Sequence, residues 1–267
     1  MCRDCGCEAG NERIFEKMGS GKTNKTNGHY HDGHYHEHAH GHDHAQEHDH
    51  QPRRTIELET RVLEQNDLLA EENRKWLNKK EVMSVNMISS PGSGKTFLLE
   101  KTLEALRGNV HAAVITGDQQ TDNDAKRLSG KGAPVAQIET FSSCHLDAGR
   151  LAPFLKEVVQ DETQLLFIEN VGNLVCPAAF DLGEQFKIAL LSVTEGEDKP
   201  LKYPVLFADS PVVVITKTDL VPYLDWDMTQ CRKNIRKVRP DAKIFELSAK
   251  TGEGMQSWLG YLVDLVR

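Results

Sequence analysis

Short apolar runs alternate with helix-length amphipathic stretches from residue 82 to the end of the chain. The apolar runs are rich in valine, isoleucine and leucine, which is typical of strands that are buried on both faces of a sheet. They cover residues 82–88, 110–116, 165–169, 188–193, 212–216 and 243–247. Helical patterns lie between most of them, at residues 96–106, 146–159, 227–238 and 255–266. This alternation predicts an α/β domain, with a mostly parallel sheet, helices on both faces and ligands at the carboxyl ends of the strands.

A further helix is predicted over residues 55–80, ahead of the first apolar run. Its apolar side chains form two rows with a seven-residue spacing, namely Val62, Leu69 and Trp76, and Ile56, Leu63, Ala70 and Leu77. Both rows lie on one face of an α-helix. We expect this face to pack on the α/β domain, and a free coiled coil is the alternative.

Residues 1–54 have almost no aliphatic side chains, so they cannot bury enough apolar surface to offset the entropy of ordering. Ten of the twelve histidines lie between positions 29 and 50, where no lysine or arginine occurs. We therefore predict a metal-binding tail over residues 1–54 that is disordered without metal. A single domain over residues 55–267 follows it, since this length is ample for one core.

Composition narrows the classes of partner. The net charge of −8 argues against nucleic acid. The chain has neither a run of eighteen apolar residues nor an apolar signal region, which predicts a cytoplasmic protein without membrane contact. In that compartment its six cysteines are reduced, and they become candidate metal ligands instead of disulfides.

Residues 89–96 have the pattern of a phosphate-binding loop, because they join a predicted strand to a predicted helix. Backbone N–H groups and the helix N-terminus face the phosphates in such a loop, and glycines leave room for them. Lys95 is placed to contact the β and γ phosphates, and Thr96 to ligate Mg²⁺. Ser89 stands where the general motif has its first glycine. The predicted phosphate-binding residues are Pro91, Gly92, Ser93, Gly94, Lys95 and Thr96.

A similar string at residues 19–23 lacks the context that phosphate binding needs. No apolar strand precedes it, Glu16 stands in place of the first glycine, and the residues from Asn24 on are not helical in pattern. We do not expect this string to bind phosphate.

The base is predicted from the residues that follow two later strands. Asp219 can accept hydrogen bonds from both N1–H and the exocyclic amine of guanine, a pair that adenine lacks, and the stem of Lys217 packs on the base. Thr216 replaces the more usual asparagine of this string. The second contributing segment is Ser248, Ala249 and Lys250. Together these residues predict GTP as the nucleotide.

Two acidic residues are candidates for the Mg²⁺ and water side of the reaction. Asp118 follows the strand that is predicted to end at Thr116, and Glu169 ends the strand 165–169. Either carboxylate can hold Mg²⁺ or position the attacking water, and a solvated helix-capping acid is the alternative. With Lys95 they form the predicted catalytic set. No glutamine or arginine finger can be assigned, so we expect slow intrinsic hydrolysis.

Metal ligands are predicted in three places. Cys144, His145 and Cys176 offer two thiolates and an imidazole, which suit Ni²⁺ or Zn²⁺ but form an incomplete set, while buried structural cysteines are the alternative. A second subunit could complete this set at a symmetric dimer interface. Cys231 has no neighbouring partner, and we place it in the core or at the surface. The tail offers Cys2, Cys5 and Cys7, which suit square-planar Ni²⁺, and the histidines His29, His31, His34, His36, His38, His40, His42, His44, His48 and His50.

Four strings resemble the HypB family. They are residues 89–96, 117–121 (Gly-Asp-Gln-Gln-Thr), 169–177 (Glu-Asn-Val-Gly-Asn-Leu-Val-Cys-Pro) and 195–200 (Glu-Gly-Glu-Asp-Lys-Pro). The resemblance covers residues 55–267, agrees with Ser89, and favours the metal role of Cys144, His145 and Cys176. It implies a SIMIBI-type P-loop fold and a GTPase that delivers nickel during [NiFe]-hydrogenase maturation. It also implies a GTP-dependent homodimer, a nickel-delivery accessory protein and a hydrogenase large-subunit precursor as partners.

Two other functions compete with a GTPase metallochaperone. The chain could be a nickel store or buffer whose GTPase is incidental. It could also be a urease-accessory GTPase or an ATP-using kinase on the same scaffold. Residues 216–219 argue against ATP, and residues 169–177 argue against the urease relative.

Overall fold

The computed structural model describes residues 52–118, 123–140 and 144–267. Residues 60–267 form one compact unit. The predicted tail lies outside the described residues except for residues 52–54, which belong to a helix. Within the described ranges, no helix combines the length and the apolar character that crossing a lipid bilayer requires.

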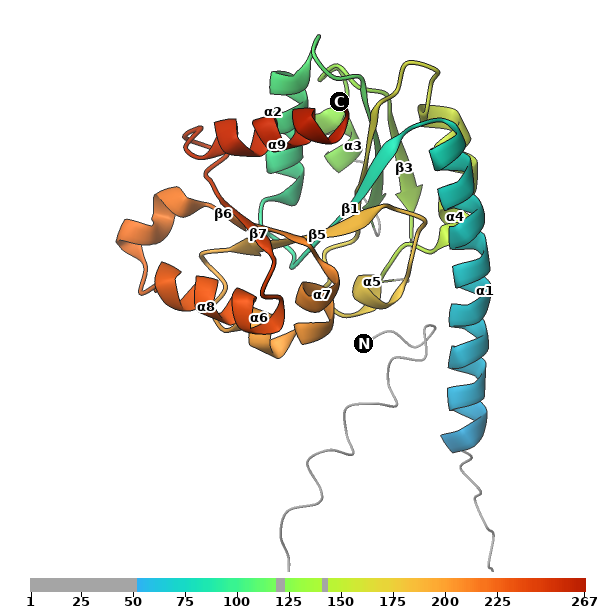
Figure 1. The fold of residues 1–267 in the computed structure, drawn as a ribbon, viewed down its shortest axis with the longest axis horizontal. Coiled ribbons are helices and arrows are strands. Elements are labelled where there is room, and N and C mark those ends of the chain that lie inside the picture. Colours follow the sequence, from blue (N-terminus) through green and yellow to red (C-terminus); the bar gives the residue numbers. More distant parts are fainter. Residues whose placement is uncertain (1–51, 119–122, 141–143) are drawn as a thin grey trace, which may run out of the picture. The chain divides into compact units, whose positions relative to one another are not determined.

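The centre of the domain is a parallel sheet, as the alternating apolar pattern predicts (Figure 1). Seven strands pair in the order β3-β2-β4-β1-β5-β6-β7, and every neighbouring pair of the described sheet is parallel. Parallel strands place their carboxyl ends at one edge of the sheet, where ligands of such folds bind. The strands are β1 (Met83–Ser89), β2 (Ala112–Asp118), β3 (Val135–Glu139), β4 (Leu165–Glu169), β5 (Phe186–Ser192), β6 (Val212–Thr216) and β7 (Lys243–Glu246).

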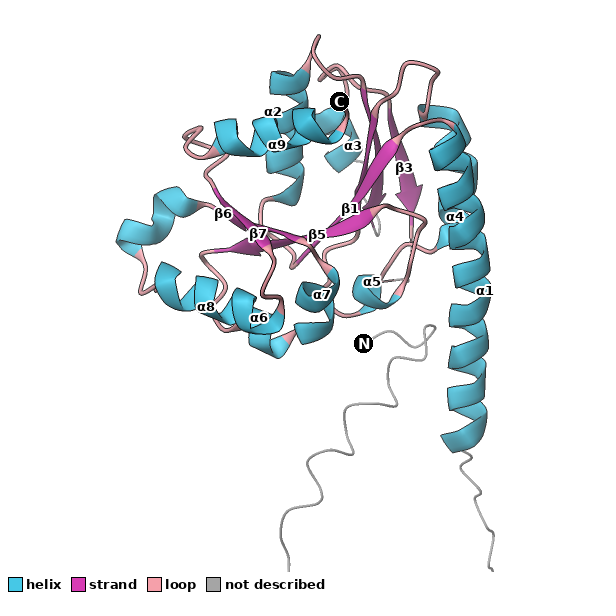
Figure 2. Ribbon diagram, viewed as in Figure 1, coloured by secondary structure: helices cyan, strands magenta, loops and turns pink. Residues whose placement is uncertain are grey.

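Helices cover both faces of this sheet (Figure 2). Helices α2 and α9 lie over one face, whereas α1 and α4 lie over the other face near β2 and β4. The short helices α5 to α7 and helix α8 cover that second face near β5 and β6. The helices are α1 (Pro52–Lys79), α2 (Lys95–Leu106), α3 (Asn123–Leu128), α4 (Ala148–Val158), α5 (Cys176–Ala179), α6 (Lys199–Lys202), α7 (Pro204–Asp209), η2 (Thr218–Tyr223), α8 (Met228–Val238) and α9 (Met255–Leu265).

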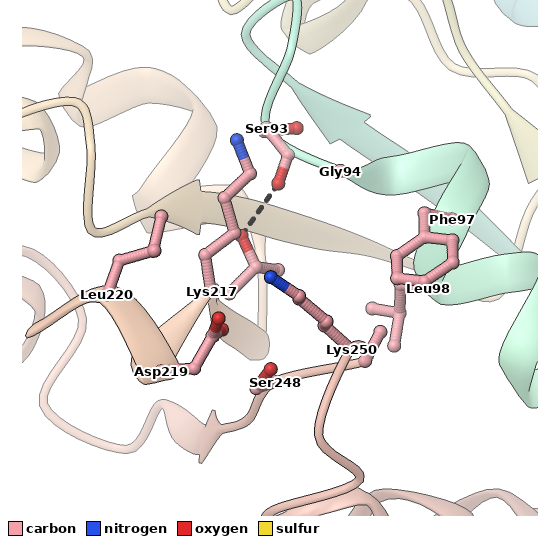
Figure 3. Close-up of a pocket in the computed structure, with 11 residues that line it drawn as sticks. Ser93, Gly94, Phe97, Leu98, Lys217, Asp219, Leu220, Ser248 and Lys250 are labelled. Carbon is pink, nitrogen blue, oxygen red and sulfur yellow. Dashed lines mark hydrogen bonds between the residues drawn. The ribbon is translucent and has the colours of Figure 1, made fainter.

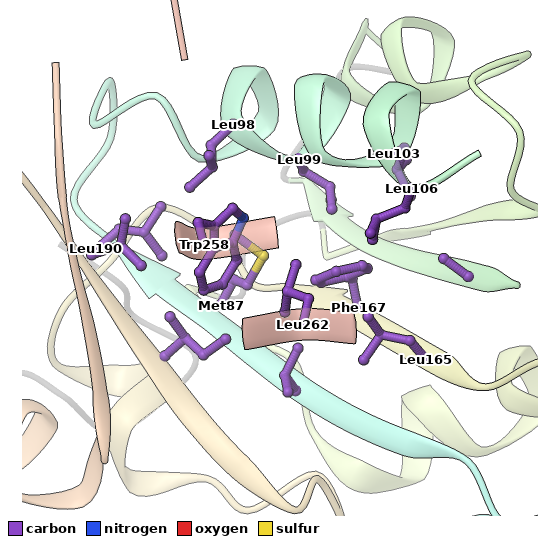
Figure 4. Close-up of a cluster of buried hydrophobic side chains, with 14 of the residues drawn as sticks. Met87, Leu98, Leu99, Leu103, Leu106, Leu165, Phe167, Leu190, Trp258 and Leu262 are labelled. Atoms are coloured by element: carbon purple, nitrogen blue, oxygen red, sulfur yellow. The ribbon is translucent and has the colours of Figure 1, made fainter. Parts of the chain in front are cut away.

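Alternate residues of each strand enter opposite layers of the core. Phe167 of β4 packs in the layer beneath α2 and α9, while its neighbour Ile168 packs in the layer beneath α1 and α4. Trp258 of α9 is fully buried in the first layer (Figure 4). Its indole N–H donates to Thr102 Oγ1 at 3.0 Å. Replacing this side chain by alanine would cost about 3–5 kcal/mol of stability.

Helix α1 packs on the domain, so the predicted packing is confirmed and the free coiled coil is wrong. Ala70 and Leu77 are fully buried, and Leu77 belongs to the same core layer as α4. Contact weakens toward the start of the helix, where the Val62 side chain is half-exposed. The helix begins at Pro52, three residues before the predicted start at residue 55.

Several predicted boundaries are wrong for identifiable reasons. The helix predicted from residue 146 begins at Ala148, because the Asp147 carboxylate caps it by accepting from the Arg150 backbone N–H. Strand β2 continues through Asp118, so this residue ends the strand and does not follow it. Strand β3 was not predicted, since Gln137 interrupts its short apolar pattern at the edge of the sheet.

Candidate functional site

The phosphate-binding loop joins β1 to α2, as predicted. Gly92 and Gly94 have φ angles of 73° and 93°, a region that residues with a Cβ atom rarely adopt. Gly94 is the residue before Lys95, the first residue of α2, so the N-terminal N–H groups of α2 open onto the loop. The backbone therefore has the geometry that anion binding at a helix N-terminus requires.

Two hydrogen bonds connect the end of β6 to this loop. Thr216 Oγ1 donates to the Ser93 carbonyl oxygen at 2.7 Å, and Lys217 Nζ donates to the Gly92 carbonyl oxygen at 2.6 Å. Thr216 thus has a structural role that the sequence alone did not suggest. These bonds hold the predicted base-binding segment beside the predicted phosphate-binding loop.

A pocket brings together the three segments that the sequence nominated for the nucleotide (Figure 3). Asp219 and Lys217 line it from the end of β6, and Ser248, Ala249 and Lys250 line it from the end of β7. Ser93 and Gly94 of the loop complete the phosphate side. Phe97, Leu98 and Leu220 also line the pocket and were not predicted. They add the apolar surface on which a planar base can rest, and no sequence motif marks them.

A second pocket adjoins the loop on its phosphate side and is lined by Pro91, Gly92, Lys95 and Thr96. Arg127 of α3 also lines it, while its guanidinium pairs with Glu100 Oε2 at 3.1 Å. No sequence motif assigns this arginine to a site. The structure places its positive charge at the same pocket as that of Lys95.

Glu169, a predicted Mg²⁺ ligand, lies beside the first two residues of α2. Its side chain is 1% exposed, Oε1 accepts from Thr96 Oγ1 at 2.6 Å, and Lys95 Nζ lies 3.3 Å from the same oxygen. The other oxygen, Oε2, is buried and has no hydrogen-bond partner among the described residues. Buried polar atoms without a partner are rare, and a carboxylate oxygen beside a threonine hydroxyl fits Mg²⁺ chemically.

Two further buried hydroxyls of this region, Ser93 Oγ and Thr116 Oγ1, also have no partner among the described residues. Thr116 pairs in register with Glu169 across β2 and β4. Asp118 ends the same strand two residues later, but its side chain lies outside the described residues. Its role therefore stays a prediction.

The structure brings Cys144, His145 and Cys176 together, and this group of three candidate ligands is here called the metal cluster. One ligand atom from each lies within 4.8 Å of the others, although Cys176 begins α5 and the other two residues precede α4. The His145 ring stacks on Phe180 with 3.8 Å between ring centroids. Burial lowers the pKa of His145, Arg150 lowers it further, and Asp147 opposes them. A lowered pKa favours the neutral imidazole, which is the form that can ligate metal.

Cys231 has a different environment. It is fully buried in the core layer beneath α8, and this burial raises the pKa of its thiol to about 12. A thiol with so high a pKa is a poor ligand and a poor nucleophile. Of the two placements predicted for it, the core is correct.

Asn170 connects Glu169 to the segment that carries Cys144 and His145. It follows Glu169 directly, and its Oδ1 accepts from the backbone N–H groups of Leu146 at 3.3 Å and Val171 at 2.9 Å. Its Nδ2 donates to Asn86 Oδ1 of β1 at 3.2 Å. Leu146 itself adjoins His145. The two sites thus share a buried hydrogen-bond network that the sequence did not reveal.

The remaining predicted ligands, Cys2, Cys5, Cys7 and the ten tail histidines, lie outside the described residues, as do residues 19–23. Their predicted roles are not tested by this geometry.

Comparison with known proteins identifies the family of the chain. Residues 84–246 match the family model described as CobW/HypB/UreG, nucleotide-binding domain. The hydrogenase maturation factor HypB of Escherichia coli K12 is 51% identical over 210 residues, which cover 79% of this chain and 72% of that protein.

Two solved structures are also similar. HypB of Archaeoglobus fulgidus has a TM-score of 0.72 and 36% identity, and the match covers 77% of this chain and 100% of that one. HypB of Helicobacter pylori, solved in complex with nickel, has a TM-score of 0.71 and 38% identity, over 75% of this chain and 94% of that one. The P-loop, the parallel sheet and these matches together show that the chain belongs to the HypB family of hydrogenase maturation factors, within the CobW/HypB/UreG nucleotide-binding proteins.

Proposed function

We propose that this chain is a cytoplasmic GTPase that binds nickel and delivers it during [NiFe]-hydrogenase maturation. One observation supports this proposal most directly. The short segment from Glu169 to Cys176 begins at the acid beside Lys95 and Thr96 and ends at a ligand of the metal cluster. A change around the γ phosphate therefore has a short covalent path to the metal.

In the nucleotide site, the loop backbone cradles the phosphates and Lys95 neutralises the charge that develops on them. Thr96 and Glu169 would hold Mg²⁺, which supplies further neutralisation of that charge when it is bound. Glu169, or Asp118 at the end of β2, orients the attacking water. Asp219 selects guanine by accepting two hydrogen bonds from its edge, which predicts GTP over ATP.

In the metal site, two thiolates and a neutral imidazole hold Ni²⁺, and the same ligands are suitable for Zn²⁺. Three ligands leave a coordination position to be filled. Cys176 is part-exposed, and we propose that a second copy of the chain completes the set in a GTP-dependent homodimer. Opening of that dimer after hydrolysis would release the metal.

In the tail, Cys2, Cys5 and Cys7 supply a thiolate site and the histidines at residues 29–50 supply a store of nickel. Neutral imidazoles at nearly every second position offer many overlapping chelates, which a plain linker does not need. A nickel-delivery accessory protein would exchange metal with the chain, and the precursor of the hydrogenase large subunit would receive it. The competing proposal is a nickel store whose GTPase is incidental.

Lys95→Ala separates these two proposals in cells that lack the native gene. The variant should hold nickel but fail to restore hydrogenase activity, because GTP turnover drives delivery. Lys101→Ala is a matched control, since Lys101 also lies on α2 but pairs with the exposed Glu104. Normal maturation with Lys95→Ala would favour the nickel store and overturn the proposed chaperone.

A further inference from the structure

The metal cluster is assembled from two backbone segments that are distant in sequence. Cys144 and His145 lie just before α4, whereas Cys176 begins α5. The two segments meet where the Phe180 ring stacks on His145 and where Asn170 Oδ1 accepts from the Leu146 backbone N–H. A third element also bridges the two segments, further along each of them.

Helix α1, which runs beside α4 (Figure 1), is that element. Its first bridging residue is Asn66. Asn66 is 5% exposed, and its Oδ1 accepts from the backbone N–H of Ala148 at 2.9 Å. Its Nδ2 donates to the carbonyl oxygen of Asp181 at 2.8 Å. One side-chain amide therefore bonds to the segment after His145 and to the residue after Phe180.

Asn73 repeats this arrangement two helical turns later on the same face of α1. It is 5% exposed, and its Nδ2 donates both to the carbonyl oxygen of Ala148 at 2.9 Å and to that of Leu182 at 3.1 Å. Both asparagines thus bridge the same two backbone segments. An apolar side chain could fill the same space, but it could not fix the position of one backbone against another.

Two more contacts hold the Phe180 side of the cluster against α1. Arg74 makes two hydrogen bonds to the carboxylate of Asp181, at 2.7 and 2.6 Å. Gly183 has a φ angle of 91°, and a Cβ atom there would lie 2.5 Å from the carbonyl oxygen of Ala70. The chain after Phe180 therefore touches the backbone of α1 directly.

We infer that Asn66 and Asn73 are positioning residues for the metal site. They set the separation of the two ligand-bearing segments, and with it the stacking of His145 on Phe180 and the distance from His145 to Cys176. This inference rests on the proposed metal role of Cys144, His145 and Cys176. Outer residues that orient metal ligands typically change metal affinity about 10- to 100-fold when they are removed.

The test uses the full-length chain with Cys2, Cys5 and Cys7 replaced by serine and with Co²⁺ as the probe. In this background, thiolate-to-metal charge transfer reports Cys144 and Cys176, because histidines give no such band and Cys231 is buried. A chelator competition gives the affinity of the site that produces the band. GTP turnover and thermal unfolding of the same samples report the rest of the domain.

Asn66→Ala and Asn73→Ala should each weaken Co²⁺ binding about 10- to 100-fold and alter the charge-transfer band, with GTP turnover within a few-fold of the parent. Asn66→Asp keeps the acceptor for Ala148 and should recover part of the affinity. Asn78→Ala is the matched control, because Asn78 is an exposed asparagine of α1 that accepts from Gln185 Nε2, whereas the bonds of Asn66 and Asn73 reach Ala148, Asp181 and Leu182. If an alanine variant does not fold, Arg74→Gln tests the same attachment of the Asp181 segment to α1. It should weaken Co²⁺ binding by a smaller factor.

The outcomes separate the two claims. If the parent chain has no charge-transfer band, and its spectrum is the same as that of Cys176→Ala, the metal site is overturned and the proposed function with it. Suppose instead that the parent chain has a normal band. If the band and the Co²⁺ affinity of Asn66→Ala, Asn73→Ala and Arg74→Gln then equal those of Asn78→Ala, the positioning role alone is overturned.

Discussion

The nucleotide site and the metal cluster lie at the same edge of the sheet but are built in different ways. The phosphate-binding part of the first is one continuous loop whose shape follows from its own glycines and from the start of α2. The second gathers ligands from two segments, and a third element, α1, bridges those segments through Asn66 and Asn73. A site of the first kind is fixed locally, whereas a site of the second kind depends on packing across the domain.

This difference predicts how independently the two sites respond to mutation. Changes within the nucleotide site should leave the metal ligands in place, because no ligand belongs to that loop. Changes to the metal ligands should leave nucleotide affinity unchanged, because none of these residues belongs to the phosphate-binding loop. Only the shared segment from Glu169 to Cys176 and the network of Asn170 should transmit an effect from one site to the other.

The largest effect is expected for Asp219→Asn. The substitution replaces two acceptor positions by one acceptor and one donor, so GTP affinity should fall by about 100-fold or more while xanthosine triphosphate affinity rises. Titration with both nucleotides measures this change, and nickel affinity should not move. Asp225→Asn, at a nearby exposed aspartate, is the control. Unchanged GTP affinity would remove Asp219 from the base site.

A smaller effect is expected for Cys176→Ala. Removing one of three protein ligands should weaken nickel binding at the domain site by at least about 10-fold, since even outer residues have effects of that size. GTP affinity should stay within a few-fold, but nickel should no longer influence it. Cys231→Ala removes a cysteine of the core and should leave nickel binding unchanged. If both variants lose nickel equally, the thiolate assignment is wrong.

The smallest effect concerns the protonation of His145. Burial lowers its pKa in the folded chain, so His145 should titrate below the ordinary value of about 6.5. The unfolded chain then binds the proton first, and the folded state loses stability as pH falls from about 6.5 through the folded pKa. NMR titration of the metal-free chain, with His145→Gln to assign the signal, measures this. A pKa at or above 6.5 would show that the ring is not desolvated as described.

The same contrast explains what the sequence could predict. The phosphate loop, Glu169 and the segments around Asp219 and Ser248 were predictable because each follows a continuous apolar strand. Cys144, His145 and Cys176 were predictable as residue types, but their proximity was supported by family resemblance and not by spacing. The bridging hydrogen bonds of Asn66 and Asn73 were not predictable, because a polar residue on a mostly polar helix does not indicate which backbone it will contact.

Short or irregular elements were also beyond the sequence. Strand β3 has too few apolar residues to be distinguished from a loop, and α5 has only four residues. Both matter to the sites, because β3 leads to the segment of Cys144 and α5 begins with Cys176. Long periodic elements such as α1 and α8 were predicted to within a few residues, since their patterns extend over several turns.

We expect nucleotide state and metal affinity to be coupled through the segment from Glu169 to Cys176. The most direct test is the nickel affinity of the full-length chain, with Cys2, Cys5 and Cys7 replaced by serine, measured from the thiolate charge-transfer band without nucleotide, with GDP and with a non-hydrolysable GTP analogue. We predict affinities that differ by about 5- to 150-fold between GDP and the analogue, with the same factor recovered when nickel is varied and nucleotide affinity is measured. Asn170→Ala should reduce that factor. Equal nickel affinity in all three states would contradict the account and would mean that GTP hydrolysis serves a step other than metal release.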